Sequence, residues 1–395
     1  MSRIYVCEVC IEDPELQDVV RANAISEQCD YCGRSDGVPI ACEVCDVVER
    51  INFAIYQEYG PPYEETLYDK EEGDYFGNVL EHTEVFEEIG FCLDNEQLQD
   101  DIVGSFWEER FCRKGMLSGS TSERQMDAWS GFKKIIRHQR RYTFWSMAED
   151  DCEHGIIEHP PSDMMKNIAL TMGEFDLVKE VPIGKEFWRV RVHDQTRELE
   201  LPKEISAPTS GQAKFANRMS AAGIPMFYGS DERKTAVLET VSADTKNDKC
   251  ITGGAFKSLR PLIILDLYDL PKMRSFFVNW REDARESLEF LKAFHLDISE
   301  PISKDGLHHI EYVPTQVFTE FIRFELKPTI GDQFNGIRFK SSKDGKGCYV
   351  LFFDQADCLP DIEFRRQDQQ LEFVETSQFK MTVKEFQDEH KEPDV

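Results

Sequence analysis

The sequence predicts an α+β protein, with a helical N-terminal part followed by a domain of mixed helices and strands. Three C-x-x-C pairs lie within the first 45 residues, and residues 46–165 carry apolar residues at helical spacing with little strand-like alternation. From about residue 180, short runs rich in β-branched and aromatic residues alternate with helical segments. Such a change of texture is typical of an all-helical part joined to an α+β domain.

The charge of the chain limits its partners. The 395 residues carry a formal net charge of −29, and 41% of them are hydrophobic. This hydrophobic fraction allows a sizeable core, and the length allows two or three domains. Phosphate backbones and anionic membrane surfaces attract clusters of Lys and Arg, so we expect neither nucleic acid nor a membrane as a direct ligand. The charge would suit a basic protein partner by electrostatic steering.

The cellular compartment is inferred from missing targeting signals. No apolar run approaches the roughly 20 residues of a membrane span, and the start, MSRIYVCEVC, lacks the parts of a secretion signal. We therefore expect a cytoplasmic protein. In a reducing compartment the twelve cysteines would be thiols or metal ligands rather than a disulfide framework.

The first two cysteine pairs predict a structural zinc site in the segment 1–45. Cys7 and Cys10 form one C-x-x-C turn, and Cys29 and Cys32 form another eighteen residues later. Each turn directs two thiolates at one tetrahedral ion, so the two turns complete a site with no open position. Chance pairs of buried thiols, or a redox pair, are the alternatives. A redox pair normally starts a helix after a strand.

Residues 46–165 are expected to form a helical domain. It begins near the third pair, Cys42 and Cys45, which lies at i, i+3 and is expected to supply two small buried hydrophobic residues rather than a second metal site. The following run, CDVVERINFAIYQEYG, places its valines and isoleucines on one helical face. Two adjacent prolines in EHGIIEHPPSD, residues 153–163, indicate a linker at the end of this domain.

Residues 166–365 are expected to form the α+β domain, and residues 366–395 a polar tail with a weak strand pattern in LEFVETSQFKMTVKEF. The predicted strands include EFWRVRV, IPMFYGS, RPLIILDLY and KGCYVLFF, and the predicted helices include DERKTAVLETV and REDARESLEFLKAFHL. Within this domain, ANRMSAAGIPMFYGSDERKTAVLETV gathers an arginine, a glycine turn, a tyrosine and a glutamate in 26 residues.

Five segments occur in order over roughly residues 180–355, and they are FWRVRV, ANRMSAAGIPMFYGSDERKTAVLET, LRPLIILDLYDLP, HIEYVPTQVFTEFIR and GIRFKSSKDGKGCYVLFF. Together these segments resemble the RES domain family. The resemblance implies a fold similar to ADP-ribosyltransferases and an activity that consumes NAD, by phosphorolysis or hydrolysis, in toxins countered by an antitoxin. The part before this domain resembles the zinc-plus-HEPN region found fused to RES domains, so the whole chain resembles a HEPN/RES fusion.

The helical region lacks the residue pair that catalytic HEPN domains use to cleave RNA. Catalytic HEPN domains carry an arginine a few residues before a histidine. Here Arg137 stands directly before His138, and no pair with the catalytic spacing appears in the helical region. An RNase activity is therefore not expected, and Arg140, Arg141 and His138 are expected to lie on a solvated or inter-domain face.

The residues that match the RES motif suit the chemistry of NAD. Guanidinium groups bind phosphate oxygens bidentately, for which Arg189 and Arg218 are the candidates. Tyr228 offers an aromatic surface to nicotinamide. A carboxylate, for which Glu239 is the candidate, would stabilise the positive charge that develops on ribose.

The resemblance adds Ser341 as a catalytic residue, Ser342 beside it as a binding residue, and Gly223 as a position where the backbone approaches the ligand. Taken singly, each of these residues also fits an ordinary structural role. A hydroxyl is lost at Trp188 and Phe339, where tyrosine is common in the family. This departure bears on substrate positioning more than on the class of reaction.

The sequence leaves three functions open. The chain is expected to be an NAD glycohydrolase or NAD phosphorylase, with zinc as a structural metal, NAD as substrate, an antitoxin or regulatory protein as partner, and a homo-oligomeric state. The same site could transfer ADP-ribose to a macromolecule. A non-catalytic zinc and helical interaction module is the third possibility. Water and phosphate both stay open as the acceptor.

Overall fold

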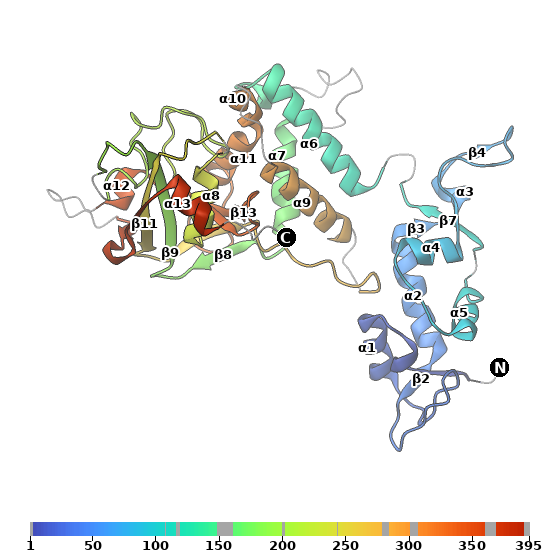
Figure 1. Ribbon diagram of the computed structural model, residues 1–395. Helices are drawn as coiled ribbons and strands as arrows, with labels where there is room; N and C mark the ends of the chain where they lie inside the picture. Colours follow the sequence, from blue (N-terminus) through green and yellow to red (C-terminus); the bar gives the residue numbers. More distant parts are fainter. Residues whose placement is uncertain are drawn as a thin grey trace. The chain divides into compact units, whose positions relative to one another are not determined.

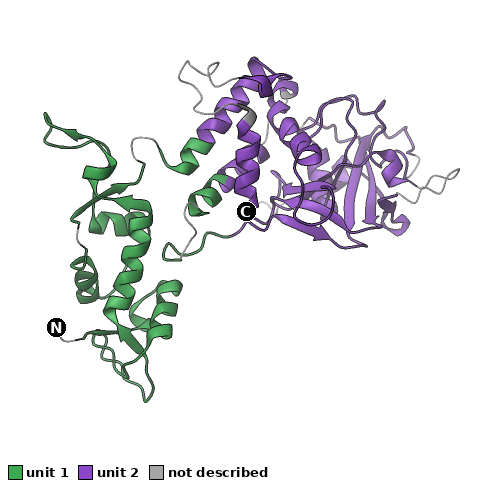
Figure 2. Cartoon of the chain, turned by 180° about the vertical axis from the view of Figure 1, so that it is seen from behind, with its two compact units in different colours: residues 1–125, 272–290 green, residues 126–271, 291–395 purple. Residues whose placement is uncertain are grey.

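The computed structural model describes residues 3–106, 108–115, 119–147, 161–199, 202–242, 244–278, 284–300, 307–359 and 369–390. The chain divides into two compact units, shown in Figure 2. Unit 1 comprises residues 1–125 and 272–290, and unit 2 comprises residues 126–271 and 291–395. Helices and strands are both well represented, which confirms the α+β class.

Unit 1 joins short helices to small two- and three-stranded sheets. Its described elements are β1 (Tyr5–Cys7), η1 (Glu8–Cys10), α1 (Pro14–Asn23), β2 (Ala41–Glu43), α2 (Val44–Glu58), β3 (Tyr59–Gly60), α3 (Pro62–Glu65), β4 (Tyr68–Asp69), β5 (Asp74–Tyr75), β6 (Leu80–Glu81), α4 (His82–Glu88), α5 (Glu96–Val103) and β7 (Arg110–Arg113). Asp13 caps α1 because its Oδ1 accepts from the backbone N–H of Glu15 at 2.9 Å. Pro14 at the first helical position fits the same signal.

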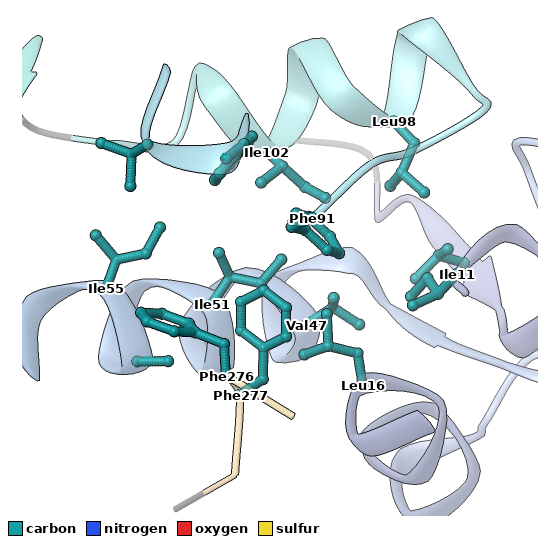
Figure 3. Close-up of a cluster of buried hydrophobic side chains, with 14 of the residues drawn as sticks. Ile11, Leu16, Val47, Ile51, Ile55, Phe91, Leu98, Ile102, Phe276 and Phe277 are labelled. Atoms are coloured by element: carbon teal, nitrogen blue, oxygen red, sulfur yellow. The ribbon is translucent and has the colours of Figure 1, made fainter. Parts of the chain in front are cut away.

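The core of unit 1 is built on α2, as its sequence pattern predicts. Val47, Ile51 and Ile55 are buried and face the same cluster at i, i+4 spacing (Figure 3). Phe276 and Phe277 enter this cluster from the segment 272–290, far along the chain. The ring centroids of Phe91 and Phe277 lie 4.8 Å apart in an edge-to-face arrangement. A segment from within the expected RES domain thus completes the core of unit 1.

The helices of unit 2 include part of the region expected at 46–165. The described helices that lie in unit 2, or reach into it, are α6 (Thr121–His138), η2 (Phe144–Ser146), α7 (Pro161–Gly173), α8 (Arg233–Thr240), α9 (Ala284–Ser299), α10 (His308–Glu311), α11 (Val313–Phe324), α12 (Gln355–Cys358), η4 (Glu375–Ser377) and α13 (Val383–Glu389). From Met126 onward α6 belongs to unit 2. There the indole Nε1 of Trp129 donates to Asp297 Oδ2 of α9 at 2.7 Å. The expected helical region is therefore divided between the units.

Within the described residues, a nine-stranded sheet forms the centre of unit 2. Its strands are β8 (Val178–Val181), β9 (Glu186–His193), β10 (Phe227–Ser230), β11 (Cys250–Ser258), β12 (Leu262–Asp266), β13 (Gly336–Lys340), β14 (Gly347–Leu351), β15 (Leu371–Phe373) and β16 (Phe379–Thr382). The order is β15-β11-β9-β10-β14-β13-β12-β8, with β16 also on β11. Pairing is antiparallel except between β12 and β13. β9 pairs with β10 at a single position, Trp188 opposite Ser230, so the sheet opens between these strands.

The segment expected as a polar tail contributes to this sheet. β15 and β16 both pair with β11. α13 lies beside α8 (Figure 1), and its Val383 and Phe386 are buried in one cluster with Ala236 and Val237 of α8. These strands are only three and four residues long, too short to give a clear alternation in sequence. No helix in the described part of the chain combines the length and the hydropathy needed to cross a bilayer.

Candidate functional site

A cavity of about 850 Å³ lies in unit 2 where β9 and β10 separate. Both strands line it, together with the loop after β9, the C-terminal end of α8 and the turn after β13. Of the residues expected from sequence, Arg189, Arg218, Tyr228, Glu239 and Ser342 line the cavity. The three residues that the sequence gathers in one stretch, an arginine, a tyrosine and a glutamate, therefore share one cavity.

Arg218 is held in the cavity by α11 and the C-terminal end of α9. Its backbone carbonyl accepts from Thr315 Oγ1 at 2.5 Å, and its Nη1 donates to the carbonyl of Ile298 at 2.7 Å. Gln316 Nε2 fixes the same turn by donating to the carbonyl of Asn217 at 2.8 Å. Burial lowers the pKa of the Arg218 guanidinium, an effect that Tyr312 and the Glu239 carboxylate oppose. Arg218 keeps its charge because guanidinium does not titrate in the physiological range.

Tyr228 lies on β10 with its hydroxyl tied to a neighbour. Its OH and Ser220 Oγ share a hydrogen bond of 2.9 Å. Burial raises the pKa of Tyr228 to about 12, so the phenol is neutral at physiological pH. The ring thus offers a neutral aromatic surface to the cavity.

Glu239 and Ser341 form a hydrogen-bonded pair at the edge of the cavity. Ser341 Oγ donates to Glu239 Oε1 at 2.5 Å. Ser341 is buried and its Oγ also accepts from the backbone N–H of Lys343 at 3.1 Å, so the hydroxyl position is fixed from the turn side. Glu239 is exposed and lines the cavity, whereas Ser341 does not line it. The serine is placed to orient the carboxylate.

Arg189 spans the opening between the strands. Its Nε donates to the carbonyl of Ile205 at 2.8 Å, and its Nη1 donates across to the carbonyl of Tyr228 on β10 at 2.6 Å. The guanidinium also lies 5.0 Å from the ring centroid of Phe227. Burial lowers the pKa of Arg189 below its usual value. Two of its nitrogens therefore bind protein carbonyls, which joins the two strands where their ladder has ended.

Gly223 lies outside the cavity lining, in the turn that precedes β10. Its φ is +90°, a conformation that L side chains rarely adopt, and a Cβ would meet nothing within 4 Å. Its N–H donates to the carbonyl of Ala213 at 2.7 Å. The backbone conformation of this turn therefore accounts for the glycine without a ligand.

The cavity is cationic although the chain is acidic. Among the described residues, seven Lys or Arg line it against two glutamates, in a chain of net charge −29. The cations are Arg189, Arg191, Arg197, Lys203, Lys214, Arg218 and Lys343, and the acids are Glu204 and Glu239. Cations concentrated at a cavity within an acidic chain favour an anionic ligand.

Several cavity residues were not singled out from sequence. Arg191 follows Arg189 by two positions on β9, so strand periodicity places both on one face of the sheet. Its Nε donates to the carbonyl of Glu204 at 3.3 Å. Ser220 is found only through its bond to Tyr228, which sequence spacing does not reveal. Tyr312 precedes the Pro-Thr-Gln segment and lines the cavity.

Unit 1 holds the four cysteines expected to bind metal. The sulfur atoms of Cys7, Cys10, Cys29 and Cys32 all lie within 4.8 Å of one another. The Cys7–Cys32 and Cys10–Cys29 sulfur distances are 3.6 and 3.8 Å. Tetrahedral zinc with bonds of about 2.3 Å requires sulfur atoms roughly 3.8 Å apart. The four thiols therefore can hold a metal such as zinc.

The two cysteines of the third pair, Cys42 and Cys45, lie in different environments. Cys42 is buried in the core of unit 1, as expected, but Cys45 is exposed, and the expectation of burial is wrong for it. Cys42 is the middle residue of β2, whereas Cys45 lies in the first turn of α2. A strand and a helix meet between the two residues, so helical spacing does not relate them.

Two family models match the chain, and together they confirm the resemblance to a HEPN/RES fusion. Residues 22–150 match HEPN/RES N-terminal domain 1, and residues 186–374 match the RES domain. The second match contains every element that lines the cavity. No curated protein and no solved structure matches the chain.

Proposed function

We propose that this chain, a HEPN/RES fusion, cleaves the bond between nicotinamide and ribose in NAD and depletes NAD in the cell as a toxin or defence effector. A RES domain points at a general level to a toxin-like, NAD-related function. The finer proposal is carried by the cationic cavity, which combines seven Lys or Arg residues with one exposed glutamate beside a buried serine. An antitoxin partner and a homo-oligomeric state stay predictions.

The proposed reaction assigns the diphosphate to Arg218. Its turn is fixed by three hydrogen bonds from α11, and its guanidinium is held by the bond from Nη1 to the carbonyl of Ile298, so the side chain has little conformational freedom to lose. Phosphate oxygens match the planar geometry of guanidinium N–H donors, and only Nη1 of Arg218 donates to a protein carbonyl among the described residues. The phosphate-binding role expected for Arg189 stays a prediction, because two of its nitrogens already donate to carbonyls.

Glu239 is the proposed catalytic carboxylate. When the bond between ribose C1′ and the nicotinamide nitrogen breaks, its electron pair leaves with nicotinamide and positive charge develops on the ribose. A nearby carboxylate stabilises that charge. An oxygen of water or phosphate then bonds to C1′, and Glu239 can accept the proton that water loses. Ser341 acts as a positioning residue, since its hydroxyl holds one carboxylate oxygen.

The test is product analysis with the purified chain and NAD labelled in its adenosine half. The proposal expects free nicotinamide together with ADP-ribose, or with ADP-ribose 1″-phosphate when phosphate is the acceptor. Repeating the reaction with and without phosphate distinguishes the two acceptors. Glu239→Gln is expected to remove the activity, whereas Glu389→Gln, at an exposed glutamate of α13, keeps it.

Two other results would replace the proposal. Label that stays on protein would show transfer of ADP-ribose to a macromolecule. If expression of the wild type and of Glu239→Gln is equally harmless, and neither depletes cellular NAD, the chain is an interaction module rather than an NAD-degrading enzyme.

A further inference from the structure

Phe215 is an exposed aromatic ring at the cavity. Its side chain is 80% exposed, more than any other large hydrophobic residue in the described part of the chain. It also lines the cavity. Isolated exposed apolar side chains are common and need no explanation. An exposed ring on the wall of a cationic cavity is a different case, because a ligand can cover it there.

The loop that carries Phe215 is closed by its own hydrogen bonds. The N–H of Gly223 donates to the carbonyl of Ala213 at 2.7 Å, and the N–H of Asn217 donates to the carbonyl of Ser220 at 2.8 Å. The Asn217 amide also donates to the carbonyl of Phe215 itself at 3.4 Å. The ring is thus presented on an ordered loop, so a ligand that covers it loses little binding energy to loop ordering.

Cations lie on both sides of Phe215 in the chain. Lys214 precedes it and Arg218 follows three residues later, and both line the cavity. Arg197 and Lys203, from the preceding part of the same connection, line it as well. A flat apolar surface among cations fits a planar base attached to phosphates, since the ring stacks on the base while the cations bind the phosphate oxygens.

We propose that Phe215 stacks on the adenine of the dinucleotide, an assignment that rests on the proposed function. The nicotinamide end belongs to Tyr228 and Glu239, because the bond that breaks must lie at the catalytic carboxylate. Arg218 and Phe215 line the same cavity as Tyr228 and Glu239, and the Arg218 guanidinium is the proposed diphosphate ligand. The second base of the dinucleotide then extends past the diphosphate to the exposed ring of Phe215.

Calorimetric titration of the full chain with ADP-ribose, AMP and nicotinamide mononucleotide tests the assignment. Phe215→Ala is expected to raise the Kd for ADP-ribose and AMP by about tenfold or more, equivalent to about 1.4 kcal/mol or more. The Kd for nicotinamide mononucleotide is expected to stay unchanged. Phe215→Tyr, which keeps a ring, should bind like the wild type, and Phe215→Leu should fall between. Because the side chain is exposed, the thermal unfolding midpoint should not change.

Phe324→Ala is the matched control. Phe324 is 67% exposed and lies outside the cavity lining, so its loss should change none of the three affinities. Unchanged ADP-ribose binding by Phe215→Ala overturns the proposal. The proposal is also overturned if Phe215→Ala weakens binding of nicotinamide mononucleotide and leaves AMP binding unchanged. It is overturned as well if the wild type binds none of the three compounds. A wild type that shows the Phe215 effect but consumes no NAD overturns the proposed function and supports the adenine assignment.

Discussion

Ser341 Oγ donates to Glu239 Oε1 at 2.5 Å, which joins the turn between β13 and β14 to the C-terminal end of α8. The two residues are 102 positions apart in sequence. Ser341 therefore holds one oxygen of the carboxylate, while Glu239 itself lines the cavity. In the proposed reaction, a carboxylate held in this way would act on the ribose without losing side-chain freedom.

Ser341→Ala is expected to lower kcat for NAD cleavage more than it changes KM. A hydrogen bond to a charged group contributes roughly 1.5–3 kcal/mol, so kcat should fall by roughly ten- to hundredfold. Steady-state kinetics of the purified variant measure this, with the unfolding midpoint as a check on folding. A kcat equal to that of the wild type would show that the serine does not position the carboxylate.

Substitution of Arg189 is expected to lower stability, whereas substitution of Arg218 is expected to remove ligand binding. Arg189→Ala leaves the carbonyls of Ile205 and Tyr228 without their donors and should lower the free energy of unfolding by about 3 kcal/mol. Arg218→Ala should abolish binding of ADP-ribose with a smaller loss of stability, because its side chain is only half-buried. Urea unfolding and calorimetric titration of both variants separate the two roles. Equal losses of stability would contradict the structural role given to Arg189.

The buried histidine of α9 is expected to make the folded protein less stable at acid pH. His295 is 7% exposed, and its Nε2 is buried without a hydrogen-bond partner among the described residues. Burial lowers the pKa of His295 below 6.5, with Lys340 acting in the same direction. Below pH 6.5 the unfolded chain binds a proton that the folded chain does not bind. The free energy of unfolding therefore decreases as the pH is lowered from 6.5 to the lowered pKa of His295, by about 1.4 kcal/mol per pH unit.

His295→Leu removes this contribution. Urea unfolding between pH 8 and 5 should give parallel curves for wild type and variant above pH 7. Below pH 6.5 the variant should lose stability less steeply. If both lose stability with the same slope between pH 6.5 and 5, the histidine is not held neutral by burial.

The sequence predicts those features of the protein that depend on residues near one another in the chain. The C-x-x-C spacing predicts the cluster of Cys7, Cys10, Cys29 and Cys32, because each pair is fixed by a single turn. Helical periodicity likewise predicts the buried face of α2. The order of the RES motifs predicts that Arg218, Tyr228 and Glu239 share a cavity.

The parts that sequence does not predict depend on distant contacts. Arg189 looks like any strand arginine until the carbonyls of Ile205 and Tyr228 are placed beside it. β15 and β16 are stabilised by pairing with β11, which their own short patterns do not indicate. The place of Phe276 and Phe277 in unit 1 rests on contacts with residues more than 150 positions earlier.

The four-cysteine cluster predicts one zinc ion for each chain. Metal analysis of the purified protein should find it, and Cys29→Ser should lose it, because three thiolates bind the ion more weakly than four. Since metal binding and folding are coupled, a strong chelator should unfold the β1–β2 region. Circular dichroism with and without chelator measures this. Cys92→Ser, at an exposed cysteine outside the cluster, should keep its zinc, and the same metal content in Cys29→Ser would contradict the site.

Phe277 predicts that unit 1 depends on a segment far along the chain. Its side chain is 2% exposed and packs edge-to-face on Phe91. Arg285, in the same segment, lies with its Nε 3.2 Å from Glu58 Oε1 of α2, and its guanidinium lies 4.8 Å from the ring centroid of Phe276. Phe277→Ala should therefore lower the free energy of unfolding of unit 1 by about 4 kcal/mol, through lost burial and the cavity that is left.

A fragment of residues 1–125 tests the same dependence without a substitution. It lacks both phenylalanines, so the apolar surface around Val47, Ile51 and Phe91 would face water. We expect the fragment to melt without a cooperative transition and to gain one when residues 272–290 are supplied through a flexible linker. Phe76→Ala is the matched control for Phe277→Ala, because Phe76 belongs to unit 1 but is 50% exposed, and it should change stability little. A fragment 1–125 that unfolds cooperatively by itself would show that unit 1 needs no part of the segment 272–290.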